Sequence, residues 1–144
     1  MPGWLKIMLI VAVACVVLGV VAAVAGFLWF RAHAGELRER AEAVRAEARE
    51  LGASSTPDGC VGGALRRLDS GRGILDQAMA QAFLGGCLEA APADPRFCEG
   101  VPARSEIMAS VRWALGRCAE LGRADDQACA RILGEVQSYC HPSQ

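Results

Sequence analysis

The stretch CAELGRADDQACARILGEVQSYC, Cys118–Cys140, spaces three cysteines evenly, with a step of 11 residues between neighbours. Eleven residues make about three turns of an α-helix, so cysteines at this step lie on one helix face. Within one helix their Cα atoms are about 16 Å apart, whereas disulfide-bonded Cα atoms lie within about 7 Å. Cys129 and Cys140 must therefore bond to cysteines on other elements.

The turn inside this stretch predicts the first partner. Gly122 is typical of a residue that follows a helix end, and Asp125 is typical of a residue that caps a helix start. Cys118 lies four residues before Gly122, and Cys129 lies four residues after Asp125. The two cysteines therefore face each other across a helical hairpin, and we expect them to form a disulfide.

The C-terminal part of the chain contains four further cysteines, which are Cys60, Cys87, Cys98 and Cys140. Together with the first pair they make six, an even number. Six cysteines allow about 15 connectivities, and spacing alone does not choose among them. The antiparallel order of the helices favours Cys60–Cys87 with Cys98–Cys140. The alternative joins Cys87 to Cys98 and Cys60 to Cys140.

Metal binding and thiol chemistry are less consistent with this spacing. Zinc ligands usually come in close pairs such as C-x2-C, and a redox or catalytic thiol is typical of C-x-x-C or of a cysteine with a histidine base. No two of these six cysteines are closer than 11 residues, and the only nearby histidine is His141. We expect structural disulfides and no metal or cofactor, with a thiol-redox enzyme as a less favoured alternative.

Helical periodicity predicts an all-α head formed by residues 58–144. The predicted helices are residues 57–68, 74–90, 103–121 and 125–140. Thr56 followed by Pro57 is typical of a helix start. Gly85-Gly86 inside the second helix indicates a close helix contact or a kink.

Apolar spacing also predicts which side chains these helices bury. In the second helix, Leu75, Ala78, Phe83 and Cys87 are among the residues expected to face inward. For the third helix the inward residues are expected to be Ile107, Val111, Leu115 and Cys118.

The segment Ile7–Phe30, IMLIVAVACVVLGVVAAVAGFLWF, contains no charged residue and follows a short flank, residues 1–6. About 20 apolar residues are enough to span a bilayer as a helix. Trp4 lies near one end and Trp29 with Phe30 at the other, where aromatic side chains are enriched at membrane interfaces. Residues 7–30 are therefore predicted to form a transmembrane helix.

A charged segment, residues 31–52, follows this span, and a linker, residues 53–57, separates it from the head. Leu37, Val44 and Leu51 belong to an apolar stripe over two heptads, which favours a helix that continues the span. We interpret this helix as a solvated stalk. A short parallel coiled coil is the alternative.

The apolar segment also has features of a signal peptide, since AVA at Ala23–Ala25 fits a cleavage site. Its apolar core is longer than the 7–15 residues typical of signals, so we favour a retained anchor. Cleavage would instead release a small helical regulator or inhibitor.

Two signals conflict over which side of the membrane holds the head. Disulfides need an oxidising compartment, which places the head outside the cytoplasm. The positive-inside rule compares five arginines after the span with Lys6 and the amino terminus before it, and it favours the opposite orientation. We give more weight to the cysteines. Because the composition is rich in Ala, Gly and Arg, which have GC-rich codons, we expect a bacterial inner-membrane protein.

No catalytic motif is present, so the sequence predicts a structural or protein-interaction accessory of the cell envelope and not an enzyme. A net charge of −1 gives no electrostatic footprint for nucleic acid, and nothing indicates a small-molecule ligand. The expected partners are membrane lipid and a protein or a second copy of the chain. Trp113 and Arg117 are candidate partner anchors. Small residues at Cys15, Gly19 and Ala23 form a candidate dimer face in the membrane.

Overall fold

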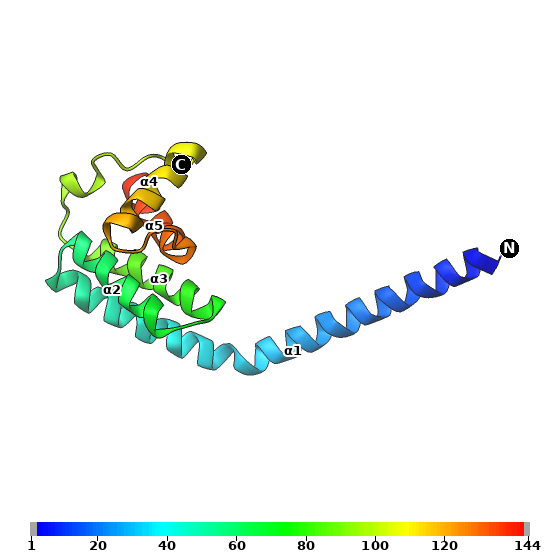
Figure 1. The fold of residues 1–144 in the computed structure, drawn as a ribbon. Coiled ribbons are helices and arrows are strands. Elements are labelled where there is room, and N and C mark those ends of the chain that lie inside the picture. Colours follow the sequence, from blue (N-terminus) through cyan, green and yellow to red (C-terminus); the bar gives the residue numbers. More distant parts are fainter. Residues whose placement is uncertain (1–2, 143–144) are drawn as a thin grey trace. The chain divides into compact units, whose positions relative to one another are not determined.

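The computed structural model describes residues 3–142, and the described residues form helices and loops without a strand (Figure 1). The elements are α1 (Gly3–Ser54), α2 (Pro57–Ser70), α3 (Ile74–Ala90), the 3₁₀ helix η1 (Pro95–Cys98), α4 (Ile107–Glu120) and α5 (Gln127–Cys140). The chain divides between Arg40 and Ala41 into two compact units. The predicted all-α fold, with a long apolar N-terminal helix and a disulfide-bonded C-terminal region, is confirmed.

The first unit contains the apolar part of α1, and its side chains are exposed. Its most apolar 18-residue window has a mean hydropathy of 3.2, so by length and composition this helix can cross a membrane, a property that signal sequences share. Trp29 stacks on His33 with ring centroids 4.5 Å apart, and His33 Nδ1 lies 2.8 Å from the carbonyl oxygen of Trp29. The aromatic residues at the predicted interface, Trp4, Trp29 and Phe30, are all exposed.

The second unit begins earlier than the head predicted from the sequence. Residues 41–54 of α1 belong to it, and Val44, Ala48 and Gly52 are buried. The apolar stripe that suggested a solvated stalk or a coiled coil thus packs, in this part, on the head of the same chain. The helix also covers the first two residues of the expected linker and ends at Ser54.

Small residues bring α1 and α3 very close together. A Cβ atom built on Gly52 would lie 2.3 Å from the carbonyl oxygen of Cys87 and 2.9 Å from Ala90 Cβ. One built on Gly86 would lie 3.4 Å from Ala48 Cβ. The glycine pair of α3 therefore marks a close helix contact, one of the two alternatives that the sequence left open. These contacts also set α1 and α3 parallel, with Ala48 level with Gly86 and Gly52 level with Ala90.

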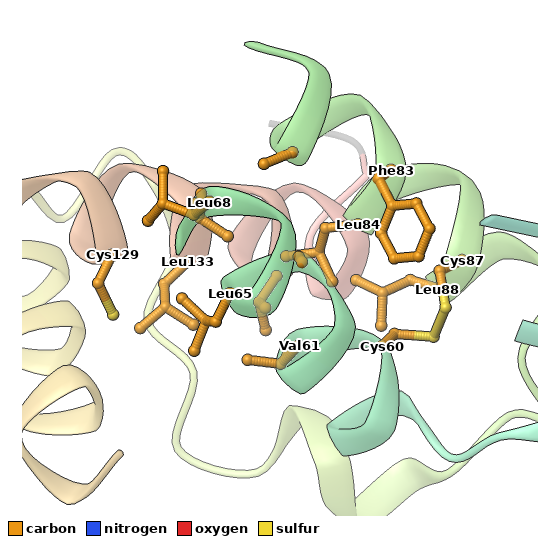
Figure 2. Close-up of a cluster of buried hydrophobic side chains, with 14 of the residues drawn as sticks. Cys60, Val61, Leu65, Leu68, Phe83, Leu84, Cys87, Leu88, Cys129 and Leu133 are labelled. Carbon is orange, nitrogen blue, oxygen red and sulfur yellow. A yellow bond between two sulfur atoms is a disulfide. The ribbon is translucent and has the colours of Figure 1, made fainter. Parts of the chain in front are cut away.

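The core lies among α2, α3 and α5, with part of α1 against it (Figure 2). Its large apolar members are Val61, Leu65, Leu68, Phe83, Leu84, Leu88, Ile132, Leu133 and Val136. Fully burying one side chain of this kind contributes about 1.5–3 kcal/mol, so this cluster supplies most of the hydrophobic stabilisation of the head.

The predicted inward face of α4 is right for Cys118 and wrong for its other three residues. Ile107, Val111 and Leu115 are 70%, 52% and 37% exposed, whereas Ala114 and Cys118 are buried. The helix packs mainly on α5, to which the Cys118 disulfide joins it. Because exposure falls along α4 toward that bond, burial of the stripe is confined to the C-terminal end of the helix.

The predicted face of α3 is right in part. Phe83 and Cys87 are buried as expected, together with Ala80, Leu84 and Leu88. Leu75 and Ala78, near the start of the helix, are instead exposed. This end of α3 extends beyond the elements that cover the rest of the helix.

Local backbone motifs define the turn between α4 and α5. Gly122 adopts a φ of 75°, donates to the carbonyl of Ala119 at 3.0 Å, and is followed by Arg123, which donates to the carbonyl of Cys118 at 2.7 Å. This is a Schellman motif, in which a glycine with positive φ satisfies the last carbonyls of a helix. The N-cap of α5 is Asp126 and not Asp125, since Asp126 Oδ1 accepts the backbone N–H groups of Ala128 and Cys129 at 2.9 and 3.1 Å.

Arg123 connects this turn to the end of α2. Its guanidinium donates to Asp69 and, at 2.7 Å, to Asp126. The hydrogen bond with Asp69 is the main cause that raises the pKa of Arg123. Burial acts to raise the pKa of Asp126, but hydrogen bonds from the Cys129 N–H, from Arg123 and from the Ala128 N–H outweigh it, and the pKa is lowered.

The α1–α3 contact predicts opposite effects for two glycine substitutions. Gly52→Ala should lower the free energy of unfolding by about 1–3 kcal/mol, because its methyl group overlaps the Cys87 carbonyl. Gly116→Ala, in the interior of α4 with nothing within 4 Å of its Cβ position, should raise it by about 1 kcal/mol through helix propensity. Urea unfolding of the full chain in detergent measures both, and equal effects would contradict the contact.

The lowered pKa of Asp126 predicts a loss of stability in acid. The folded state holds this carboxyl deprotonated below its ordinary value of 3.8, so the contribution is complete above that value and is lost as pH falls through the folded pKa. Asp126→Asn should be less stable than the parent near neutral pH and lose less stability below about pH 4. Unfolding curves across this range test it, with exposed Asp125→Asn as the matched control, and identical pH profiles of Asp126→Asn and the parent would contradict it.

Candidate functional site

Three disulfides connect the described elements of the head. They join Cys60 to Cys87, Cys98 to Cys140, and Cys118 to Cys129, with Cα–Cα distances of 5.6, 5.5 and 6.1 Å. These are the pairs that the helix spacing favours, and the alternative set is not the one that the structure contains. Figure 2 shows the first of them between α2 and α3.

These bonds leave little for thiol or metal chemistry. Within residues 3–142 the free cysteine is Cys15, which is exposed on the apolar part of α1. In the same described range, no three side chains among His, Cys, Asp and Glu lie together in a way that could hold a metal ion. The bonded cysteines instead cross-link the elements that form the surface of the head.

A small cleft lies where α2, η1, α4 and α5 meet, and we call it the Trp113 cleft. Its volume is about 200 Å³. Its floor is formed by apolar side chains of α2 and α5, which are Val61, Leu133 and Val136. Its walls are two aromatic side chains, Phe97 and Trp113. Its rim consists of the charged residues Asp58, Arg96, Glu99 and Arg117.

A disulfide cysteine lies next in sequence to three of these lining residues. Val61 follows Cys60, Phe97 precedes Cys98, and Arg117 precedes Cys118. Each of the three disulfides therefore fixes the backbone of one element of the cleft. A covalent bond one residue away holds these elements in place even where their noncovalent contacts are few.

The loop that carries Phe97 is further fastened to α5. Phe97 packs edge to face on Tyr139, with ring centroids 6.2 Å apart. Gln137 donates to the carbonyl of Pro102 at 3.2 Å, and His141 Nε2 lies 2.8 Å from the carbonyl oxygen of Val101. This proline-rich segment thus forms an ordered edge of the cleft, although its composition is typical of a linker.

The rim of the cleft carries both signs of charge. Arg117 donates to Glu120 at 2.7 Å and reaches Asp58 at 3.5 Å, and its side chain remains partly exposed. Arg96 is largely exposed and lies 3.7 Å from Asp94. A ligand with either charge therefore finds a counter-charge beside the aromatic walls.

The structure brings Trp113 and Arg117, the candidate partner anchors, to this cleft. Trp113 is half-buried and packs against the core, so one side of the ring supports the fold while the residue lines the cleft. Sequence reasoning did not find Phe97, Asp58 or Glu99, which come from distant segments. The one local signal for Phe97 is its position next to Cys98, because a disulfide fixes the backbone of the neighbouring residue.

A larger open groove of about 550 Å³ lies between residues 47–54 of α1 and α2. Its charged groups engage each other, since Arg67 donates to Glu47 and its guanidinium lies 4.9 Å from the centroid of the Phe83 ring. Phe83 itself is only 2% exposed. The aromatic ring of this groove is therefore covered, whereas Phe97 and Trp113 of the Trp113 cleft are partly exposed.

Comparison with known proteins gave no match to a protein-family model, to a curated protein or to a solved structure. The assignment of function therefore depends on the geometry described above.

The disulfide framework predicts a defined pattern of alkylation. When the membrane-bound chain is denatured with an alkylating reagent and no reductant, one of the seven cysteines, Cys15, should be labelled. Prior reduction should expose all seven. Intact-mass spectrometry measures the label count and also tests signal cleavage, because removal of residues 1–25 eliminates Cys15 and shortens the chain. Labelling of the six others without reductant would contradict both the disulfides and an extracytoplasmic head.

Proposed function

We propose that this chain is a membrane-anchored interaction protein of the cell envelope, whose disulfide-bonded head binds a segment of a partner protein in the Trp113 cleft. The proposal is carried by one observation: the Trp113 cleft combines an apolar floor, two aromatic walls and a charged rim, and disulfides fix the elements that form it. Tryptophan and arginine are enriched among the residues that dominate binding energy in protein interfaces.

The size of the cleft favours a side chain of a protein as its occupant. Pockets for small molecules and cofactors usually enclose about 300–1,000 Å³. The Trp113 cleft has about 200 Å³, which suits one apolar side chain inserted between Trp113 and Phe97. Charged residues that flank the inserted side chain can then pair with Arg96, Arg117 or the acidic rim.

The disulfides support an extracytoplasmic location for the head. Buried disulfides persist in oxidising compartments and are rare in the cytoplasm. The arginines that follow the apolar segment oppose this orientation under the positive-inside rule, but long downstream domains translocate largely regardless of charge. An inner-membrane anchor with the head outside reconciles both features.

We assign no catalytic role to the head. The cleft contains carboxylates and arginines but no nucleophile beside a base, which is the geometry that covalent catalysis requires. Rim charges of mixed sign serve orientation and specificity in protein interfaces instead.

Site-specific photocrosslinking in membranes tests this proposal. A photoreactive amino acid at Arg96, on the cleft rim, should capture a discrete partner, whereas one at Arg112, exposed on α4 away from the cleft lining, should not. Trp113→Leu removes one wall while keeping an apolar side chain, and it should reduce capture at position 96 about tenfold, as loss of an interface anchor does.

Thermal unfolding and the alkylation pattern show whether the Trp113→Leu head keeps its fold. A folded variant with undiminished capture, equal capture at both positions, or no capture at position 96 would each overturn the assignment of the cleft.

A further inference from the structure

The turn between α2 and α3 exposes apolar side chains next to a basic one. Ile74 is 88% exposed and Leu75 is 47% exposed, although both are large aliphatic residues. Arg72 precedes them, in the connection between α2 and α3. We call residues 72–75 the α3 tip.

The α3 tip has a defined conformation. Asp76 accepts the backbone N–H groups of Arg72 and Gly73 at 3.1 and 2.9 Å. The other neighbouring acid, Asp69, accepts from Arg123. The two nearby carboxylates therefore have donors already, and the fold holds Ile74 outward at the first position of α3.

The parallel register of α1 and α3 places the α3 tip at the end of the head where α1 enters. Since Ala48 is level with Gly86 and Gly52 with Ala90, Ala41 is level with Met79. Ile74 lies five residues before Met79, so α3 extends about 7 Å beyond the level of Ala41 at 1.5 Å per residue.

The tether to the apolar segment is short. Eleven positions separate Phe30, the last residue of the predicted span, from Ala41, and these residues are helical. At 1.5 Å per residue this is a tether of about 16 Å, against headgroup layers of about 5–7 Å on each side of the hydrocarbon. The end of the head at which α1 enters is thus joined to the predicted span by a covalent tether of about 16 Å.

We propose that the α3 tip is a membrane contact, in which Ile74 and Leu75 enter the interfacial layer and Arg72 binds anionic lipid headgroups. This inference rests on the membrane anchoring proposed above and names the same bilayer as the partner. Apolar side chains beside a basic residue are typical of segments that lie in the membrane interface.

Such a contact would orient the Trp113 cleft. Asp58 and Val61, which line the cleft, lie in the first turn and a half of α2, whereas the α3 tip follows the opposite end of the same helix at Ser70. A head that rests on the α3 tip therefore presents the cleft away from the lipid, toward soluble or peripheral partners.

Quenching of tryptophan fluorescence by brominated lipids tests the contact in the full chain. In vesicles containing anionic lipid, Ile74→Trp in a Trp4→Phe, Trp29→Phe background should lose about half of its added emission when the lipid is brominated, as expected for a side chain about 5–10 Å into the interface. The parent background gives the contribution of Trp113.

Ile107→Trp is the matched control. Ile107 is also an exposed apolar residue in the first turn of a helix, and it lies at the opposite end of α4 from the Arg123 turn that contacts Asp69. Its emission should be unchanged by bromination. Adding Arg72→Glu to Ile74→Trp should reduce the quenching, whereas adding Arg112→Glu should not.

A variant that keeps Trp29, with Trp4→Phe alone, separates the two proposals. Quenching of Trp29 without quenching at position 74 would overturn the membrane contact and leave the anchor intact. Absence of quenching at Trp29 would overturn both. Equal quenching at positions 74 and 107 would also overturn the specific role of the α3 tip.

Discussion

The head depends on one constraint, the set of three disulfides that adjoin the Trp113 cleft. Val61, Phe97 and Arg117 each adjoin a bonded cysteine, so α2, η1 and α4 are fixed at the positions where they line the cleft. A head of this size has a small core, and three cross-links of about 2–4 kcal/mol each are comparable to its net stability. The stability of the head and the shape of the cleft therefore depend on the same three disulfides.

Helix α1 is also a structural element of the head. Its residues 41–54 pack on α3 so closely that Gly52 has no space for a methyl group, and Val44 and Ala48 complete the core cluster. The apolar stripe of residues 37–51, which resembles a coiled-coil seam in sequence, is used at its C-terminal end for packing within the chain.

Sequence reasoning found what depends on local signals and simple helix geometry. The cap at Thr56, the turn at Gly122 and the three favoured cysteine pairs all follow from spacing, and the structure contains each of them. The exposure of Ile107, Val111 and Leu115 did not follow from spacing, because periodicity gives the apolar face of a helix but not how much of its length another element covers. The cleft was beyond sequence reasoning for a different reason: its lining comes from four separate elements, and only tertiary packing joins them.

The connectivity of the cysteines also bears on how the chain matures. Cys60 bonds to the next cysteine along the chain, and Cys118 likewise bonds to its successor, whereas Cys98 passes over two cysteines to reach Cys140. A chain that is oxidised in order of synthesis brings Cys98 into the presence of Cys118 before Cys140 exists. Native pairing therefore requires Cys98 to stay reduced until Cys140 has been synthesised, or requires one exchange of disulfides afterwards. The oxidation of Cys140 thus decides when the edge of the cleft that carries Phe97 becomes permanent.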